Sequence, residues 1–427
     1  MATTVRQGPT VRTGMTVAEA IERLFGGEAP VRFEAYDGTT TGPSGASDTG
    51  PVIEVRSPDA LSYVATAPGS LGMARAYVTG AMEVRGDLHE ALSLIMSHVD
   101  RIRLRDLGEI VRGLGIGVLR RPPLPAQERR VSGLRHSRSR DAQAISHHYD
   151  VSNRFYEMVL GPSMAYTCAV YPRLDATLEE AQATKFELVA RKLGLREGMR
   201  LLDVGCGWGG MAMHAAREHG VQVLGVTLSR AQAEWARDAV AEAGLDKLVE
   251  IRHGDYRDVR ESGFDAVSSI GLTEHVGLHQ LPRYATHLRD RLRPGGRLLN
   301  HCITRPTTRA RARAGAFITR YVFPDGELLG VGRIVSALQD NGFEIRHSEN
   351  LREHYAMTLR DWGANLERNW DDAVAEAGLA TSRVWRLYMA GSRVGFDRHG
   401  IELQQVLAVK IPRGGESGMP LRPDWGS

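Results

Sequence analysis

The sequence is poor in cysteine and has no long apolar run. Its three cysteines, Cys168, Cys206 and Cys302, lie far apart in a chain of 427 residues. This number and spacing argue against a disulfide framework or a zinc site, so we expect no metal. No apolar run reaches the roughly 20 residues that a membrane-spanning helix needs. Residues 1–13 are polar and lack the apolar centre of a signal peptide, so we expect a cytoplasmic protein.

Charge is nearly balanced, with a net charge of +3, but it is unevenly distributed. Residues 101–140 hold eleven arginines and three acidic residues, and they are interrupted by Pro122, Pro123 and Pro125. This basic segment has two interpretations, a solvated connector or a surface that holds the protein peripherally at the inner face of an anionic membrane. Nucleic acid is not expected as a partner, because the segment lacks aromatic residues that stack on bases.

Composition and turn signals divide the chain into a small α+β domain and a larger α/β domain. In the small domain, Thr16–Phe25 is an amphipathic helix that two glycines end, and Val31–Tyr36 and Val52–Val55 have the pattern of strands. The predicted parts are a flexible N-terminus at 1–14, the small domain at 15–125, a basic linker at 126–141, the large domain at 142–413 and a flexible tail at 414–427.

Strands and helices alternate from residue 198 onward, which predicts a parallel sheet with helical crossovers. Ligands of such sheets bind at the carboxyl ends of the strands, so the residues there should surround one crevice. A further strand at Ile401–Ile411 is expected to close the sheet at its edge. The alternating strands are Arg200–Val204, Val221–Val226, Val249–His253, Ala266–Ile270 and Arg297–His301, and the helices are Met211–Glu218, Arg230–Ala243 and Leu281–Leu292.

A glycine-rich turn follows the first of these strands. Gly205, Gly207 and Gly210 match the spacing G-x-G-x-x-G, in which bare backbone and a helix N-terminus face a ligand. A nicotinamide cofactor would also need an acidic residue at the end of the next strand. That strand leads into Thr227, and the nearby acid is instead Asp203, just before the turn. This arrangement resembles the first motif of class I S-adenosylmethionine (SAM) methyltransferases.

Further motifs together resemble the cyclopropane-fatty-acid synthases, a family that includes the mycolic acid methyltransferases. The resemblance implies a class I SAM-methyltransferase fold, which is α/β and Rossmann-like, with helical insertions at the lipid site. It also implies that the small N-terminal domain is similar to the lipid-binding domain of bacterial synthases. The motifs are Y-T-C-A at 166–169, L-D-V-G-C-G-W-G-G at 202–210, V-T-L-S at 226–229 with Gln232, D-Y-R-D at 255–258, E-H-V-G at 274–277 and H-C-I at 301–303.

The resemblance implies a reaction and a set of site residues. The family transfers the SAM methyl group to a cis double bond of an acyl chain, and a bound bicarbonate ion then removes a proton. The catalytic residues that hold the bicarbonate would be Cys168, Glu274, His301, Ile303 and Tyr355. The residues that bind SAM would be Tyr166, Thr167, Asp203, Gly205, Gly207, Trp208, Gly209, Thr227, Ser229, Gln232, Asp255 and Tyr256.

Two branches of the family form different products, and the resemblance leaves the choice between them open. Many members have a cysteine four residues before the phenylalanine that corresponds to Phe396, where this chain has Ser392. Residues 386–393 resemble the actinobacterial branch that converts oleoyl phospholipid to 10-methylene-stearoyl lipid, the precursor of tuberculostearic acid. That branch implies a separate reductase as a partner, and a cyclopropane ring is the alternative product. The resemblance leaves open whether the protein forms a homodimer. Two other classes of function remain as alternatives: a small-molecule or nucleic-acid methyltransferase, and a non-catalytic lipid-binding protein.

Overall fold

The structure is a computed structural model that describes residues 14–44, 49–98, 106–128, 140, 151–310 and 314–425. Seven of the eleven arginines of the basic segment lie outside these residues. The chain divides into two compact units, residues 1–126 and 127–427, and each is described separately. In the described part of the chain, no helix is both long and apolar enough to cross a membrane.

The N-terminal unit is built on a four-stranded sheet with the order β2-β1-β3-β4. Its first helix begins where the sequence predicts, because Thr16 and Glu19 form a capping box, and Gly26 ends it in the left-handed conformation. The elements are α1 Val17–Phe25, β1 Arg32–Ala35, β2 Thr40–Thr41, β3 Val52–Val55, α2 Pro58–Thr66, α3 Ser70–Val78, β4 Met82–Arg85, α4 Leu88–Ser97, α5 Leu107–Leu114 and the 3₁₀ helix η3 Ile116–Leu119.

The C-terminal unit contains a seven-stranded sheet with the order β10-β11-β9-β8-β5-β6-β7. The five strands from β9 to β7 are parallel, as the alternation of strands and helices predicts, whereas β11 is antiparallel to both of its neighbours. The strands are β5 Arg200–Val204, β6 Gln222–Thr227, β7 Val249–His253, β8 Phe264–Ile270, β9 Leu292–Thr304, β10 Glu344–Asn350 and β11 Glu402–Val409.

The prediction that the last strand lies at the sheet edge is wrong. β11 is inserted between β9 and β10, and β10 forms the edge. All eight residues of β11 are buried, whereas every residue of β10 is at least partly exposed. The apolar run Val406–Val409 needs a strand on each side, while the charged and polar residues of β10 tolerate an edge.

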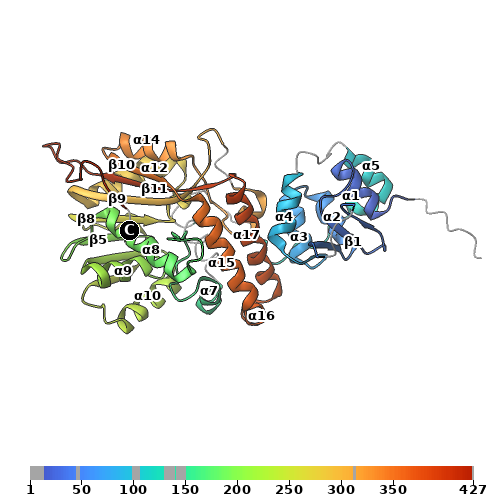
Figure 1. Cartoon of the computed structure of the whole chain (residues 1–427), viewed down its shortest axis with the longest axis horizontal. Coiled ribbons are helices and arrows are strands. Elements are labelled where there is room, and N and C mark those ends of the chain that lie inside the picture. Colours follow the sequence, from blue (N-terminus) through green and yellow to red (C-terminus); the bar gives the residue numbers. More distant parts are fainter. Residues whose placement is uncertain are drawn as a thin grey trace, which may run out of the picture. The chain divides into compact units, whose positions relative to one another are not determined.

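Helices cover both faces of this sheet (Figure 1). Leu201 packs with α8, α9 and α10, whereas Leu202 packs with α12 and α14, because successive side chains of a strand point to opposite faces. The helix α8 begins at a capping box of Thr177 and Glu180. These helices are α8 Leu178–Leu193, α9 Gly210–His219, α10 Arg230–Glu242, α12 Leu281–Arg291 and α14 Val331–Asp340.

The helices α7, α15, α16 and α17 pack mainly on one another and form the helical addition that the sequence predicts. Trp362 and Leu366 of α15 are fully buried in this layer. The remaining elements are α7 Asn153–Leu160, the 3₁₀ helices η4 Tyr256–Asp258 and η5 Leu278–Gln280, α11 Thr273–Val276, α13 Ala316–Tyr321, α15 Arg352–Arg368, α16 Trp370–Ala377 and α17 Leu379–Asp397.

Candidate active site

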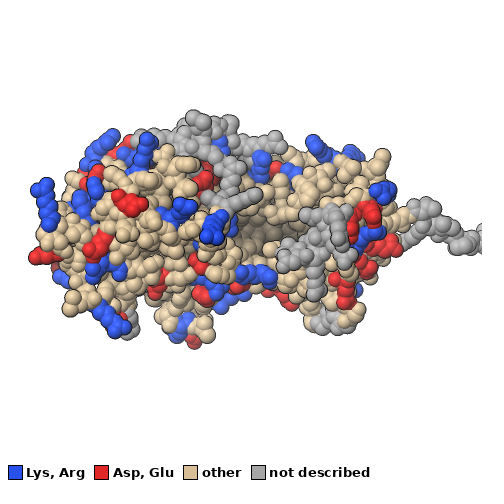
Figure 2. Space-filling view, turned by 90° about the horizontal axis from the view of Figure 1, so that it is seen from above, with Lys and Arg blue, Asp and Glu red and all other residues tan. Residues whose placement is uncertain are grey.

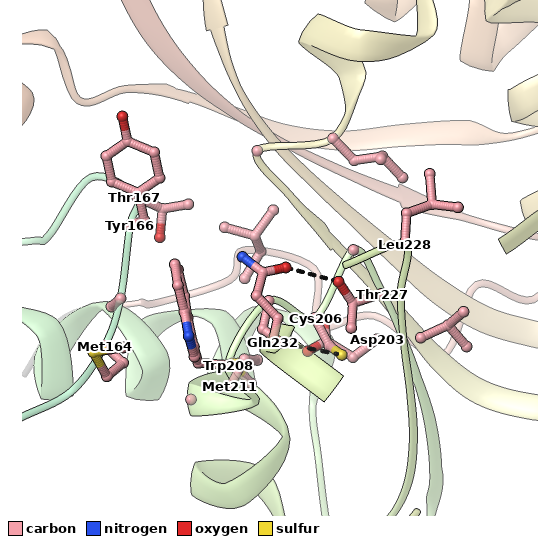
Figure 3. Close-up of a pocket in the computed structure, with 18 of the residues that line it drawn as sticks. Met164, Tyr166, Thr167, Asp203, Cys206, Trp208, Met211, Thr227, Leu228 and Gln232 are labelled. Atoms are coloured by element: carbon pink, nitrogen blue, oxygen red, sulfur yellow. Dashed lines mark hydrogen bonds between the residues drawn. The ribbon is translucent and has the colours of Figure 1, made fainter. Parts of the chain in front are cut away.

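A cavity lies at the carboxyl ends of β5, β6 and β8, where the sheet topology predicts a ligand (Figure 3). The cavity and its open mouth contain about 930 Å³ of empty space. Figure 3 shows Tyr166 and Thr167 on one side, Thr227 on the other and Gln232 between them. Nine of the twelve residues predicted to bind SAM line the cavity: Tyr166, Thr167, Asp203, Gly205, Gly207, Trp208, Thr227, Gln232 and Tyr256.

The glycine turn presents bare backbone to this cavity. Gly205 and Gly207 have φ values of 74° and 55°, in the left-handed region that favours glycine. A Cβ atom added to Gly207 would meet no atom closer than Nε2 of Gln232, at 4.0 Å. The space beside Gly207 therefore belongs to the cavity, and a ligand can lie against the peptide groups there.

Two polar side chains are held in place at the cavity wall. The hydroxyl of Thr227 donates to Oε1 of Gln232 at 2.8 Å, which leaves the amide nitrogen of Gln232 available to a ligand (Figure 3). Asp203 accepts a hydrogen bond from the Ser268 hydroxyl at 2.6 Å. Burial raises the pKa of Asp203 to about 6, and Ser268 and Lys185 act in the opposite direction. The wall therefore offers an amide donor and a carboxylate acceptor.

Lys185 also lines the cavity, although the motifs do not identify it. Its side chain is buried, and Nζ donates to Oγ1 of Thr167 at 3.1 Å. Burial lowers the pKa of Lys185 to about 7, and Cys168 and Asp203 act in the opposite direction. Because the ammonium form has only donors, the hydroxyl of Thr167 must direct its own proton to another acceptor. Lys185 follows Leu178, Ala181 and Gln182 on the buried face of α8, and this helical spacing is the signal that could have identified it.

Three residues that the resemblance assigns to SAM do not line the cavity. A Cβ atom at Gly209 would face Cβ of Ala236 at 3.4 Å, so this glycine serves the packing of α9 on α10. Ser229 caps α10 through the amide of residue 232. The carboxylate of Asp255 accepts from the backbone and the guanidinium of Arg257, which holds it at the start of η4. These three residues therefore support the elements that form the cavity wall without lining the cavity themselves.

Glu274 and Ile303 of the predicted catalytic group are in direct contact. The amide N–H of Ile303, near the end of β9, donates to Oε1 of Glu274 in α11 at 2.8 Å. Oε2 of Glu274 is buried and has no hydrogen-bond partner among the described atoms. Burial raises the pKa of Glu274 to about 7, and the Ile303 amide acts in the opposite direction. The resemblance implies that Ile303 helps to hold the ligand, and in this structure its amide donates to Glu274.

His301 lies two residues before Ile303 and projects from the same side of β9. Its Nδ1 is 3.1 Å from Nε2 of Gln405, while its Nε2 is buried without a partner in the described part of the structure. Burial lowers the pKa of His301 well below its usual value, and Lys185 and Lys192 lower it further, so the ring is neutral. A histidine nitrogen and a carboxylate oxygen are thus both left for a ligand.

Cys168 and Tyr355 complete the predicted catalytic group. The Cys168 thiol is buried beside the backbone oxygen of Ala169, and burial raises its pKa, so the thiol remains protonated. The amide of Ala169 donates to Thr358 of α15, the helix that carries Tyr355. None of the five catalytic residues lines the cavity itself. Cys168 directly follows Thr167 of the cavity wall, and the backbone oxygen of His301 accepts from Gly271 of that wall.

A cluster of aromatic rings extends from the cavity into the helical layer. Tyr156 contacts Trp208 of the glycine turn, and Tyr166 of the cavity wall contacts Trp362 of α15. The rings pack against one another, and all of them except Tyr166 and Phe323 are buried. Its members, linked by centroid distances of 4.8–6.0 Å, are Tyr156, Tyr166, Trp208, Phe323, Trp362, Trp385 and Tyr388.

A separate cluster on α8 and α9 contains residue types that bind metals. Nε2 of His214 and of His219 lie 3.3 and 3.0 Å from Oε2 of Glu187, and Arg191 donates to Oε1 of Glu187 at 2.8 Å. These donors satisfy both carboxylate oxygens, and Arg191 balances the charge. We therefore assign no metal to this cluster.

The fold and the cavity define a SAM-dependent methyltransferase. The glycine turn, the acid before it and the absence of an acid after β6 distinguish this site from a nicotinamide site. The chain belongs to the mycolic acid cyclopropane synthetase family, whose pattern matches residues 136–406. The predicted fold class and family are confirmed.

Known proteins similar to this chain modify lipids. A probable fatty acid methyltransferase of Mycobacterium tuberculosis is 52% identical over 96% of this chain and 98% of its own length. The tuberculostearic acid methyltransferase UfaA1 of the same organism is 32% identical over 95% of this chain and 94% of its own. The solved mycolic acid cyclopropane synthase CmaA1, complexed with SAH and CTAB, is 31% identical with a TM-score of 0.59 over 63% of this chain and 98% of its own. The protein is therefore an enzyme of SAM-dependent lipid methylation or cyclopropanation.

Gly207→Val should abolish SAM binding and retain the fold. The new side chain would enter the cavity beside Gln232, while the positive φ adds a strain of about 1–2 kcal/mol. Calorimetric titration with SAM and circular dichroism measure the two effects.

Gly244→Val is the matched control for this variant. Gly244 has a φ of 65°, lies just beyond α10 and has no atom within 4 Å of its added Cβ. Gly244→Val should have the same backbone strain as Gly207→Val and should still bind SAM normally. Unchanged affinity in Gly207→Val, or an equal loss in both variants, would contradict the assignment of the cavity.

Proposed function

We propose that the enzyme adds a one-carbon unit to the cis double bond of phospholipid-esterified oleoyl chains and forms 10-methylene-stearoyl chains. The observation that carries the proposal is a pair of buried atoms beside the cavity, Oε2 of Glu274 and Nε2 of His301, which have no partner in the described structure. The similarity to the tuberculostearic acid methyltransferase supports the product, because it extends over nearly all of both chains. A separate reductase would complete the methyl branch.

The cavity fits SAM. The carboxylate of Asp203 and the hydroxyl of Thr167 suit the ammonium and carboxylate groups of an amino acid, and Gly207 leaves room for the ligand. When it is bound, SAM supplies a methyl group with electrophilic character. Lys185 directs the proton of the Thr167 hydroxyl toward an acceptor, and Trp208 excludes water, since it is almost fully buried.

The anion that accepts the proton is proposed to be bicarbonate. An alkene that gains a methyl group becomes a carbocation and must lose a proton to a base. The Cys168 thiol is protonated and therefore unsuited to this task. A bicarbonate ion can donate its O–H to Oε2 of Glu274 and accept a hydrogen bond from Nε2 of His301. It would satisfy both buried atoms and supply the base.

The aromatic cluster suits both the acyl chain and the carbocation. Its rings offer apolar surface, and their faces carry partial negative charge that stabilises a cation. Loss of a proton directly from the added methyl group closes a cyclopropane ring. Loss from this methyl group after a hydride shift along the chain leaves an exocyclic methylene. Ser392 of α17 supports the methylene branch, and cyclopropanation of the same substrate is the alternative.

We also propose that the N-terminal unit contacts the membrane through a basic and apolar patch, the Ile116 patch. It consists of Ile116, Leu119, Arg120, Arg121 and Leu124. Ile116 is 82% exposed, Leu119 and Leu124 are each 51% exposed, and both arginines are exposed. Apolar side chains can enter the interface of a bilayer while neighbouring cations contact anionic headgroups.

Arg140 does not belong to the membrane surface that the basic segment predicts. Its guanidinium forms a two-point ion pair with Asp325, at 2.6 and 2.7 Å, and both side chains are largely buried. On the face of the C-terminal unit in Figure 2, basic and acidic side chains are interspersed. The proposed membrane contact therefore rests on the N-terminal unit.

Glu274→Gln should lower turnover by about 100-fold or more and leave the SAM dissociation constant nearly unchanged, because the carboxylate orients the base. It should also stabilise the fold at high pH. Since burial raises the pKa of Glu274 to about 7, the folded protein binds an extra proton between an ordinary glutamate pKa and 7, and stability falls as pH rises through this range. The variant should gain up to roughly 3 kcal/mol at pH 8 and little at pH 4.

Urea unfolding at both pH values and single-turnover assays measure these effects. Glu242→Gln is the control, because Glu242 is exposed on α10 and should change neither quantity. Full turnover in Glu274→Gln would reject the role of Glu274. A pH-independent difference in stability would reject the raised pKa.

The double variant Arg120→Gln/Arg121→Gln should bind anionic liposomes about 30-fold more weakly, at about 1 kcal/mol per arginine. Binding of the unaltered enzyme should weaken as salt increases. Ile116→Ser should weaken binding without changing its salt dependence. Leu174→Ser removes an apolar side chain that is 85% exposed on the other unit and is the matched control. Salt-independent binding that all variants share would contradict the Ile116 patch.

Expression in a host that contains oleoyl phospholipid should yield 10-methylene-stearoyl chains. Mass spectrometry of the fatty acid esters should show one added carbon, and proton NMR should show exomethylene signals in the alkene region. Cyclopropane signals, far upfield, would establish the alternative product. Lipids without an added carbon would contradict both.

A further inference from the structure

We propose that Lys192 and Gln405 are positioning residues that hold His301 in its Nε2-protonated tautomer, so that His301 donates a hydrogen bond to the anion beside Glu274. The inference rests on the proposed function of this site. It specifies how the protein prepares one of the two groups that meet the anion.

Glu349, Gln405 and His301 lie in one row across three neighbouring strands. Glu349 of β10 pairs with Gln405 of β11, and Gln405 pairs with His301 of β9. Directly paired residues project to the same face of a sheet. Lys192 of α8 lies over this row, since its Nζ donates to Oε2 of Glu349 and to Oε1 of Gln405, the latter at 2.7 Å.

Lys192 fixes the orientation of the Gln405 amide. An ammonium group has only donors, so Gln405 must present its oxygen to it. The reversed amide would place an NH₂ group against a buried cation and lose a hydrogen bond. Burial lowers the pKa of Lys192, but the adjacent Glu349 carboxylate raises it and favours the ammonium form.

The Gln405 amide then fixes the protonation of the imidazole. Its nitrogen, 3.1 Å from Nδ1 of His301, has two N–H donors and no acceptor. Nδ1 must therefore accept, and a neutral ring that accepts at Nδ1 carries its proton at Nε2. His301 is neutral because burial and the cations of Lys185 and Lys192 disfavour the imidazolium.

The resulting Nε2–H group is buried and has no partner in the described structure. An unsatisfied buried donor costs about 1–3 kcal/mol, and a bound oxyanion removes this cost. In this tautomer Nε2 has no lone pair that could take a proton. His301 is therefore a donor to the base rather than the base itself, which leaves deprotonation to the bound anion.

Two-bond ¹H–¹⁵N correlation spectra of the full-length enzyme with ¹⁵N-labelled histidine identify the protonated ring nitrogen. The His301 signals are assigned by their loss in His301→Gln. They should show the Nε2–H tautomer between about pH 6 and pH 8, around the ordinary pKa of histidine. In Gln405→Glu a carboxylate faces Nδ1 and should accept a proton from it. The ring should then become Nδ1-protonated or imidazolium.

The turnover of each variant should depend on the tautomer that His301 adopts in it. Gln405→Glu and Gln405→Met should lower kcat by about 10- to 100-fold, as loss of a supporting hydrogen bond commonly does, and change the KM for SAM less than about twofold. Lys192→Met should give a mixture of tautomers. Gln404→Met is the matched control, because Gln404 is the preceding residue of β11, projects to the other face and contacts Glu402. It should retain both the spectrum and kcat.

An Nδ1–H or mixed His301 in the unaltered enzyme would overturn the inference, as would a Gln405→Glu enzyme with normal spectrum and kcat. The spectra need neither lipid nor bicarbonate, so they test the tautomer apart from the reaction. A pure Nε2–H tautomer together with turnover that is independent of bicarbonate would reject the proposed anion and retain the positioning of His301.

Discussion

The antiparallel pairing of β11 with β9 is the contact on which the site depends. It extends from Glu402 opposite Thr304 to Val409 opposite Arg297, and it buries every residue of β11. Because β11 covers this side of β9, His301 is surrounded by protein rather than water. The same pairing sets Gln405 beside His301, so one register determines both the burial and the hydrogen bonding of the imidazole.

Several ionisable side chains of this region are buried, and their partners do not fully compensate the loss of hydration. Lys185, Asp203 and His301 are buried, and Glu274 is half-buried with an enclosed carboxylate oxygen. In each case burial shifts the pKa toward the neutral form. Such groups reduce the stability of a fold unless partners satisfy them. Glu274 and His301 each retain one atom without a described partner. The protein therefore accepts a loss of stability where a ligand can recover it.

Local signals predicted the elements well and the long-range arrangement less well. The sequence predicts β5 and β7 to the residue, because β5 is a short, mostly apolar segment and β7 alternates apolar and polar residues. The position of β11 in the sheet depends on the strands with which it pairs. Local periodicity carries no information about this pairing. Lys185 and Lys192 resemble ordinary surface lysines, and only their spacing on the buried face of α8 distinguishes them. The site motifs indicate the cavity, although Asp255, whose carboxylate accepts from Arg257, does not line it.

The two parts of the site differ in how they are built, and this difference bears on the product. The SAM cavity is formed largely by consecutive residues at strand ends, so a short motif specifies it. The proposed anion site combines β9, β11, α8 and α11 with the start of α15, and its sheet residues are held rigidly by paired strands. The acyl chain would instead meet the aromatic cluster and α17, which are parts of the helical layer. In the proposed reaction the sheet holds the base, so the packing of these helices would determine which proton of the cation comes within its reach. The proposed choice between methylene and cyclopropane would then depend on the helical layer that carries Ser392 rather than on the motifs of the sheet.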